Sequence, residues 1–199
     1  MKKSCLNVPN ALSLLRVCLV PAFVATALLM RDIEIWGAVV PAIIYVITAL
    51  TDMLDGKIAR KYNLVTDFGK FIDPLADKFM VLSAMTTLVV LMALRGDTTE
   101  TVVFLCVTLL ILFRELAVTS LRLVVAGKSG IVVAASIFGK LKTVSQMVGT
   151  VAIILEPVLF TFDESHIIAY VLMGIMSFTT VFSGIDYMRA YLPYIDTNS

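Results

Sequence analysis

Apolar residues in this chain gather into long windows separated by short polar segments. The windows that are apolar enough to form membrane helices are residues 12–30, 36–56, 74–95, 99–124, 133–157 and 165–188. A helix that crosses the roughly 30 Å hydrocarbon core of a bilayer needs about 20 residues. The window at 133–157 is the weakest, so a count of five helices stays open. The pattern predicts an all-α integral membrane protein with about six transmembrane helices.

The composition supports a membrane protein. Hydrophobic residues make up 59% of the 199 residues and charged residues 16%, and the mean hydropathy is +0.96; a soluble domain has about 25% charged residues. No linker-like stretch divides the chain, so we expect residues 1–199 to form a single membrane domain. The scattered cations form no basic face, which argues against nucleic acid as a partner. The three cysteines lack the spacing of a disulfide framework or a zinc site.

Lys and Arg residues lie mostly on one side of the predicted helices. With six helices, both termini share a side with the second and fourth connections, and this side carries all the Lys and Arg residues except Arg31 and Arg95. Cytoplasmic segments of membrane proteins are rich in Lys and Arg. We therefore expect both termini and residues 57–73 to face the cytoplasm, in the inner (cytoplasmic) membrane of the cell. His166 falls on the other side, so carboxylates must serve as bases at a cytoplasmic site.

Five aspartates lie within the 26 residues from Asp52 to Asp77. Residues i, i+3, i+4, i+7 and i+8 share one face of a helix, so four of these aspartates fall on two polar stripes with small residues. The first stripe contains Asp52, Asp55, Gly56, Ala59 and Arg60, and the second contains Gly69, Asp73 and Asp77. A short connection near residues 62–64 would set the two helices antiparallel. Both carboxylate pairs would then meet in one polar cleft on the cytoplasmic side.

Converging carboxylates need a positive partner, because like charges raise one another's pKa and ions at membrane depth are costly. Oxygen ligands favour hard cations, so we expect Mg²⁺ or Mn²⁺ to bridge the aspartates to the phosphates of a substrate. Arg60 would bind phosphate oxygens. Single aspartates also have simpler explanations: Asp73 before Pro74 could be a helix N-cap, and Asp55 could pair with Lys57 or Arg60.

These residues resemble the signature of the CDP-alcohol phosphatidyltransferase family. Its pattern is D-x-x-D-G-x-x-A-R, eight residues, then G-x-x-x-D-x-x-x-D, and every fixed position is present here at the required spacing. The resemblance implies that Asp77 is the catalytic base, and that two metal ions are held by Asp52, Asp55, Asp73 and Asp77. It implies a CDP-lipid pocket lined by Gly56, Ala59, Arg60, Asp67 and Gly69, with the first-helix neighbours Asn10 and Ser13.

The flanking segments resemble the branch of this family whose acceptor is glycerol 3-phosphate. The segments that carry this resemblance are residues 7–16, 113–115, 121–122 and 139–143. It implies transfer of the phosphatidyl group from CDP-diacylglycerol to sn-glycerol 3-phosphate by a homodimer within membrane lipid, with phosphatidylglycerophosphate and CMP as products. Ser13 stands where this branch commonly has threonine, and the hydroxyl is kept.

Glycerol 3-phosphate is a dianion near neutral pH, so its site should contain cations. The cations at the cytoplasmic ends of later helices that we expect to bind its phosphate are Arg114, Arg122, Lys140 and Lys142. Glu115 would orient Arg114 through a salt bridge. The simpler alternative is that these cations only follow the positive-inside rule. The sequence also leaves two placements of the Arg16 side chain open: it reaches the cleft, or it snorkels to the membrane interface.

Two other functions stay open at this point. A sibling enzyme would use serine, inositol phosphate or phosphatidylglycerol as acceptor, although the expected cations argue against serine. A divalent-cation transporter would also place aspartates in membrane helices. The transporter predicts carboxylates near the midplane and an internal repeat, whereas this sequence places its aspartates at helix ends and shows no repeat.

Overall fold

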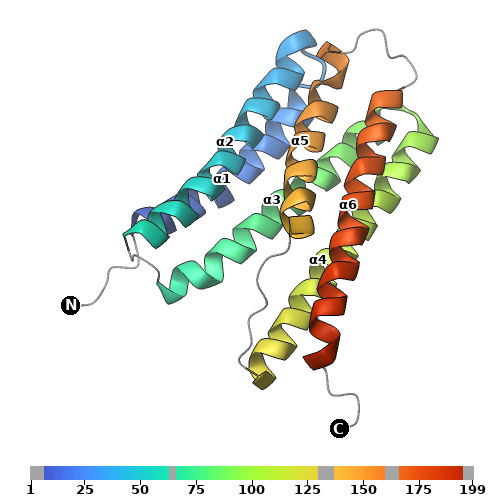
Figure 1. Ribbon diagram of the computed structural model, residues 1–199. Helices are drawn as coiled ribbons and strands as arrows, with labels where there is room; N and C mark the ends of the chain where they lie inside the picture. Colours follow the sequence, from blue (N-terminus) through green and yellow to red (C-terminus); the bar gives the residue numbers. More distant parts are fainter. Residues whose placement is uncertain (1–6, 63–65, 130–136, 160–165, 195–199) are drawn as a thin grey trace.

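The structure of the protein is a computed structural model that describes residues 7–62, 66–129, 137–159 and 166–194. Within these ranges, residues 8–9, 52–61, 67, 70, 126 and 128–129 are described by their backbone alone. The helices, shown in Figure 1, are α1 Val8–Leu29, α2 Glu34–Lys61, α3 Asp67–Arg95, α4 Thr98–Ser129, α5 Ile137–Leu159, α6 Ile167–Tyr191 and the 3₁₀ turn η1 Leu192–Tyr194. The described ranges contain no strand.

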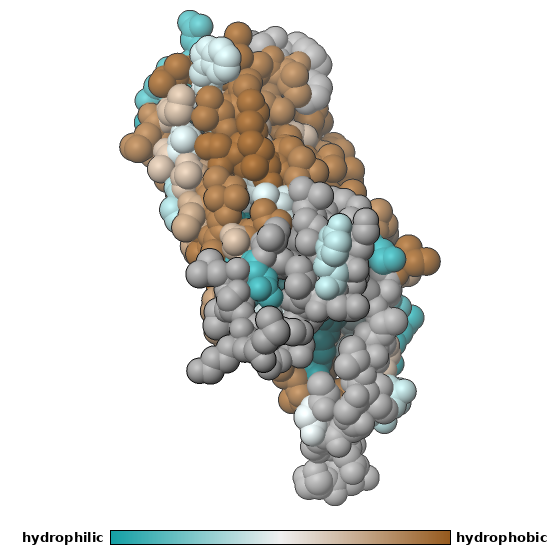
Figure 2. All heavy atoms as spheres, turned by 90° about the vertical axis from the view of Figure 1, so that its left-hand side faces the viewer, coloured by the Kyte–Doolittle hydropathy of each residue, from teal (hydrophilic) through white to brown (hydrophobic). Residues whose placement is uncertain are grey.

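All six α-helices are long and apolar enough to cross a membrane. This result confirms the all-α prediction and favours six helices over five; residues 133–136 of the weakest window lie outside the described part. Many large apolar side chains on the outside of the molecule are exposed, including Trp36, Leu109 and Phe178. Figure 2 shows this apolar surface on one face. Such a surface is suited to contact with lipid, because apolar side chains can be exposed to lipid without the free-energy cost that they have in water.

Several helices extend beyond their apolar windows into polar sequence. The α3 helix begins at Asp67, seven residues before the window at 74–95, and Thr66 is its N-cap. Pro74 lies inside this helix, so the interpretation of Asp73 as an N-cap is wrong. The cap comes from Thr66, whose Oγ1 accepts the N–H of Gly69 at 3.0 Å. The side chain of Asp73 is therefore not used for capping.

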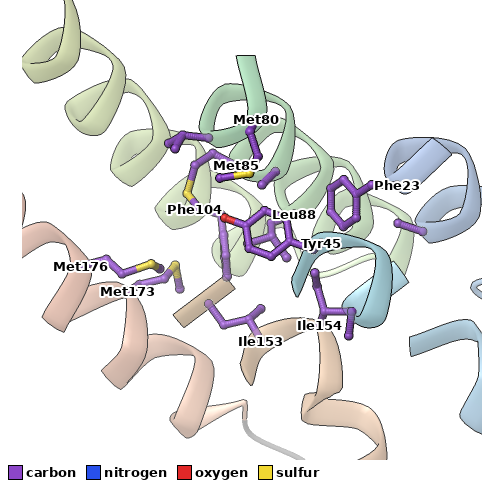
Figure 3. Packing of buried hydrophobic residues seen from close by; sticks show 14 of the residues in the cluster. Phe23, Tyr45, Met80, Met85, Leu88, Phe104, Ile153, Ile154, Met173 and Met176 are labelled. Carbon is purple, nitrogen blue, oxygen red and sulfur yellow. The ribbon is translucent and has the colours of Figure 1, made fainter. Parts of the chain in front are cut away.

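The helices pack in a closed ring, with contacts between α1 and α2, α2 and α5, α5 and α6, α6 and α4, α4 and α3, and α3 and α1. Figure 3 shows the buried cluster that joins them. Each helix contributes to this cluster, for example through Phe23, Tyr45, Leu88, Phe104, Ile153 and Met176. Lipid tails are as apolar as these side chains, so close van der Waals packing stabilises the ring.

Successive helices run in opposite directions. As a result, α1, α3 and α5 begin, and α2, α4 and α6 end, at the same end of the ring (Figure 1). We call this end the site end. It holds the last turns of α2 and the first turns of α3, where the predicted carboxylates lie. It also holds the parts of α1, α4 and α5 that carry the other predicted site residues.

Candidate active site

Polar side chains fasten the first turns of α1 to the start of α3. Asn10 Nδ2 donates to Thr66 Oγ1 at 2.9 Å, and the N–H of Gly69 donates to the same oxygen at 3.0 Å. One turn further along both helices, Ser13 Oγ donates to Asp73 Oδ1 at 2.5 Å. Asn10 and Ser13 are almost fully buried. The structure thus brings these two α1 residues against the part of α3 that carries Gly69 and Asp73.

Gly69 lies at a close approach between α1 and α3. A Cβ atom at this position would lie 2.8 Å from Asn10 Oδ1 and 3.2 Å from Thr66 Oγ1. Asn10 cannot simply retreat, because its amide is hydrogen-bonded to Thr66. Space, and not an unusual backbone angle, therefore requires glycine here.

We expect Gly69→Ala to lower the apparent midpoint of thermal unfolding in detergent, because overpacking costs about 1–3 kcal/mol. Gly174→Ala on α6 is the matched control, since a Cβ atom there meets nothing within 4 Å. This control should leave the midpoint unchanged or raise it slightly, because alanine favours helix. Equal midpoints for the two variants would contradict a tight junction at Gly69.

A cavity of about 610 Å³ lies beside Asp77, which follows Asp73 by one helical turn on α3. We call it the charged cavity. Its charged lining residues are Asp77, Lys78, Arg114, Glu115, Arg122, Lys140 and Lys142. The four cations predicted to bind the acceptor phosphate thus surround one cavity, together with the predicted base. Cations outnumber carboxylates in this lining, so the cavity favours an anion.

Glu115 holds two of these cations in place. Its Oε1 accepts a hydrogen bond from Arg114 Nη1 at 3.0 Å and another from Lys142 Nζ. Arg114 also donates through Nη2 to Ser183 Oγ on α6. The expected salt bridge between Glu115 and Arg114 is confirmed, and it extends to α5. All three charged side chains are less than one-fifth exposed, so these contacts are screened less than surface ion pairs.

The α6 helix also lines the charged cavity, although its apolar pattern carries no signature of a site. Tyr187 faces two guanidinium groups: Cζ of Arg114 lies 5.4 Å, and Cζ of Arg122 5.7 Å, from the centre of its ring. These cation–π contacts stabilise the two guanidinium groups in the same cavity, although both carry a positive charge. Ser183 and Tyr187 are polar residues four positions apart, which places them on one face of a mainly apolar helix. This spacing is the signal by which they could have been predicted.

An apolar cavity of about 210 Å³ adjoins the charged one. It lies between α3 and α4 and shares Asp77, Lys78 and Glu115 with the charged cavity. Its apolar lining residues are Leu75, Phe79, Val81, Leu82, Met85, Ile111, Leu112 and Leu116. A molecule with an anionic head and an apolar chain fits this pair of cavities, with the junction of head and chain near Asp77.

The predicted site residues of α2 are placed by their backbone only. They lie in the last turns of that helix and are Asp52, Asp55, Gly56, Ala59 and Arg60. Asp67 is likewise placed by its backbone, as the first residue of α3. Their side chains lie outside the described part of the chain. Both helix ends belong to the site end, and the convergence of their carboxylates stays a prediction.

Arg16 is fully buried in the half of α1 that belongs to the site end. A side chain that snorkels to the membrane interface would be exposed, so that alternative is wrong. Arg16 follows Ser13 by three residues and therefore shares its face of the helix. The interior of the site end thus contains a cation next to the hydroxyl that contacts Asp73.

The carboxylates of the site end fit a hard metal ion. Asp73 and Asp77 are both half-buried and lie one turn apart on α3. The α2 helix, whose last turns carry the two other predicted ligands, packs against α1, and α1 packs against α3. This donor set contains oxygen alone, which suits Mg²⁺ or Mn²⁺. A zinc-type ion would favour nitrogen or sulfur ligands.

Six helices that can span a membrane, with carboxylates, cations and an apolar cavity gathered at one end, define an integral membrane protein whose cavities suit a phosphate-bearing amphiphile. The chain belongs to the CDP-alcohol phosphatidyltransferase family, whose sequence model matches residues 6–182. That match includes every predicted site residue. The resemblance seen in the aspartate pattern is therefore confirmed over most of the chain.

Curated bacterial proteins are similar to this chain over most of their length. The CDP-diacylglycerol–glycerol-3-phosphate 3-phosphatidyltransferase of Bacillus subtilis is 39% identical over 190 residues, which cover 91% of this chain and 93% of that protein. A protein of Mycobacterium tuberculosis named as a probable phosphatidylglycerophosphate synthase is 37% identical and covers 94% of this chain, with 82% of its own length matched. A Pseudomonas fluorescens protein with the same name as the Bacillus one is 32% identical, with 97% of this chain and 94% of that protein covered.

Proposed function

We propose that this protein transfers the phosphatidyl group of CDP-diacylglycerol to sn-glycerol 3-phosphate, giving phosphatidylglycerophosphate and CMP. The observation that carries this proposal is the charged cavity, whose lining contains Asp77 and all four cations predicted to bind the acceptor phosphate. A phosphorylated alcohol suits this lining, because its phosphate matches the cations and its hydroxyl needs a base. The names of the relatives in Bacillus subtilis and Pseudomonas fluorescens support the same acceptor.

The acceptor phosphate would be bound by cations of two kinds. Arg114 and Lys142 are largely buried and fixed by Glu115, so they are suited to direct hydrogen bonds with phosphate oxygens. Arg122 and Lys140 are exposed and would attract the dianion from water. A glycerol 3-phosphate held in this way would extend its C1 hydroxyl toward Asp77.

Asp77 would then act as the general base. Its carboxylate takes the proton of the C1 hydroxyl, and the oxygen attacks the phosphorus that carries the diacylglycerol. The bond between that phosphorus and the CMP oxygen breaks, and CMP leaves with the bonding electrons. Arg60 would stabilise the charge that develops on the departing phosphate. General acid–base catalysis of this kind contributes about 10²–10⁴-fold.

Divalent ions complete the proposed donor site. Two Mg²⁺ or Mn²⁺ ions would be held by Asp52, Asp55, Asp73 and Asp77, and when bound they neutralise the pyrophosphate of the CDP-lipid. Ser13 orients Asp73 through its hydrogen bond. The remaining residues proposed to line the CMP pocket are Asn10, Gly56, Ala59, Arg60, Asp67 and Gly69.

We expect Ser13→Ala to raise the Mg²⁺ concentration needed for half-maximal activity by about 10–100-fold, as is typical when a group that orients a metal ligand is removed. Ser13→Thr keeps the hydroxyl and is the matched control, so its Mg²⁺ dependence should stay close to that of the parent protein. The measurement is the rate of CMP release over a range of Mg²⁺ concentrations. The same Mg²⁺ dependence in both variants would show that the Ser13–Asp73 hydrogen bond has no role in metal binding.

The apolar cavity would receive part of an acyl chain of the donor, because its lining is apolar and it meets the charged cavity at Asp77. The site end would face the cytoplasm, in the inner membrane, since it carries most of the Lys and Arg residues. A homodimer is also proposed, on the family resemblance alone. Its test is the mass of the protein–detergent complex.

The proposed reaction is tested by measuring CMP release from CDP-diacylglycerol by the purified protein in detergent with Mg²⁺ or Mn²⁺. Glycerol 3-phosphate, serine, inositol phosphate and phosphatidylglycerol are offered separately. We expect CMP release only when glycerol 3-phosphate is the acceptor, and we expect a chelator to abolish this release. Release only with another alcohol would assign the protein to a sibling activity. Absence of release with every alcohol would contradict the enzyme and favour the transporter.

A further inference from the structure

A second group of ionisable side chains lies far from the charged cavity, at the other end of the ring. Glu100 comes from the first turn of α4, Glu156 from the last turn of α5, and His166 is the N-cap of α6. One ligand atom from each lies within 4.8 Å of the other two. Arg95, which borders this group, follows Asp73 by 22 residues on α3, about 33 Å along the helix. The group is therefore separate from the proposed active site.

Glu100 is the unusual member of this group. Its side chain is 1% exposed, and neither carboxylate oxygen accepts a hydrogen bond from any residue in the part of the chain that the structure describes. The nearest cationic atom, Arg95 Nη1, is 3.8 Å away, beyond hydrogen-bond distance. A buried ionised carboxylate without hydrogen bonds is costly. The buried carboxylate of Glu100 therefore needs a hydrogen-bond donor or a cation that the other described residues do not supply.

Glu156 and His166 face the same point. Glu156 Oε1 accepts the N–H of Ala169 at 3.1 Å, which fixes the carboxylate. Its Oε2 lies 3.1 Å from His166 Nδ1 and 3.3 Å from Arg95 Nη1. Two buried carboxylates thus share a single guanidinium, and Asp97 adds a further acid by capping α4 through the N–H of Glu100 at 3.0 Å. The local charge is negative unless another cation or a proton is bound.

A single nitrogen of Arg95 lies among all three potential ligands. Its Nη1 is 3.3 Å from Glu156 Oε2, 3.4 Å from His166 Nδ1 and 3.8 Å from Glu100 Oε1. These distances are long for hydrogen bonds, so the guanidinium of Arg95 makes only weak hydrogen bonds to these three side chains. The Arg95 side chain is 26% exposed and also lines a cavity of about 300 Å³ that contains Asp32 and Glu34. This neighbouring cavity can receive the guanidinium beside other carboxylates.

We propose that Glu100, Glu156 and His166 form a second divalent-cation site, for a zinc-type ion that competes with the guanidinium of Arg95. Two carboxylates and an imidazole are a ligand set for Zn²⁺ and similar ions, whereas Mg²⁺ prefers oxygen ligands. Ligands about 2.1 Å from a tetrahedral ion are about 3.4 Å apart, near the 3.1 Å between Glu156 Oε2 and His166 Nδ1. The bound ion would tie α4, α5 and α6 together.

The test is binding of Co²⁺, and of Zn²⁺ in competition, to the full-length protein in detergent after treatment with a chelator. Excess Mg²⁺ is present throughout, so that the oxygen-only site at the other end is filled. We expect one Co²⁺ per chain, with the visible absorption of a site that contains an imidazole ligand, and its displacement by Zn²⁺. His166→Ala and Glu100→Gln should weaken binding by more than the roughly 10–100-fold caused by loss of a supporting group.

Two further variants separate this site from its alternatives. Asp77→Asn should leave Co²⁺ binding unchanged, because Asp77 lies at the site end. Arg95→Gln should strengthen binding, because it removes the competing cation, and this result keeps the test valid if the ligand variants fail to fold. No Co²⁺ binding in the parent protein would overturn the proposal, as would equal binding by the parent protein, His166→Ala and Glu100→Gln. A more stable Glu100→Gln without metal binding would show that a proton on Glu100 is the missing positive charge.

Discussion

Asp77→Asn is expected to reduce CMP release by at least about 10²–10⁴-fold, the contribution typical of a general base. Asparagine has nearly the same shape, so the helix and the neighbouring cavities should persist. It cannot accept the proton of the acceptor hydroxyl, and it is a weaker ligand for a hard cation. Single-turnover CMP release and binding of CDP-diacylglycerol should be measured on the same preparation. We expect loss of the first with much of the second retained.

The matched control for this prediction is Asp186→Asn. Asp186 lies near the end of α6, at the site end, and is half-buried like Asp77, but it does not line the charged cavity. Its replacement should leave CMP release close to that of the parent protein. Near-normal turnover of Asp77→Asn would remove Asp77 from the role of base. If Asp77→Asn instead mainly lost the binding of CDP-diacylglycerol, the role of Asp77 would be that of a metal ligand only.

Arg114→Ala should raise the KM for glycerol 3-phosphate and lower kcat/KM by about 10–100-fold, because a hydrogen bond to a charged group contributes about 1.5–3 kcal/mol. The KM for CDP-diacylglycerol should change little. Glu115 keeps its contact with Lys142 in this variant, so it is not left without a cation. Initial rates measured over a range of each substrate, with the other saturating, separate the two effects.

Arg189→Ala is the control for the loss of a positive charge at the site end. Arg189 is exposed in the last turn of α6 and does not line the charged cavity. We expect unchanged constants for both substrates. If Arg114→Ala raised the KM for CDP-diacylglycerol instead, Arg114 would belong to the donor pocket. Equal effects of Arg114→Ala and Arg189→Ala would favour the interpretation of these cations as positive-inside residues only.

Hydropathy predicted the number of helices because each span must present about 20 apolar residues to lipid. It failed at helix ends, where polar turns continue a helix outside the hydrocarbon. The start of α3 shows the reason: Asp73-Pro74 matches a common N-terminal pattern, but the helix is already in its second turn there. The better signal was Thr66, a favoured N-cap residue, three positions before Gly69.

The site was predictable where residues follow one another on a single helix, and less so where helices meet. Arg114 and Arg122 share a face of α4 by their spacing, and they do line the same cavity. Their common contact with Tyr187 depends on how α4 packs against α6, which no local pattern encodes. The link from Glu115 to Lys142 likewise depends on tertiary packing.

The shared wall of the two cavities has a consequence for how a lipid would reach the reaction. Pulling a long acyl chain out of a bilayer costs about 0.8 kcal/mol for each CH₂ group, which amounts to roughly 10 kcal/mol per chain. Because the apolar cavity meets the charged one at Asp77, the donor could react with its tails still among neighbouring lipids. The product would then diffuse away sideways within the same leaflet, and only the small polar molecules would need to exchange with water.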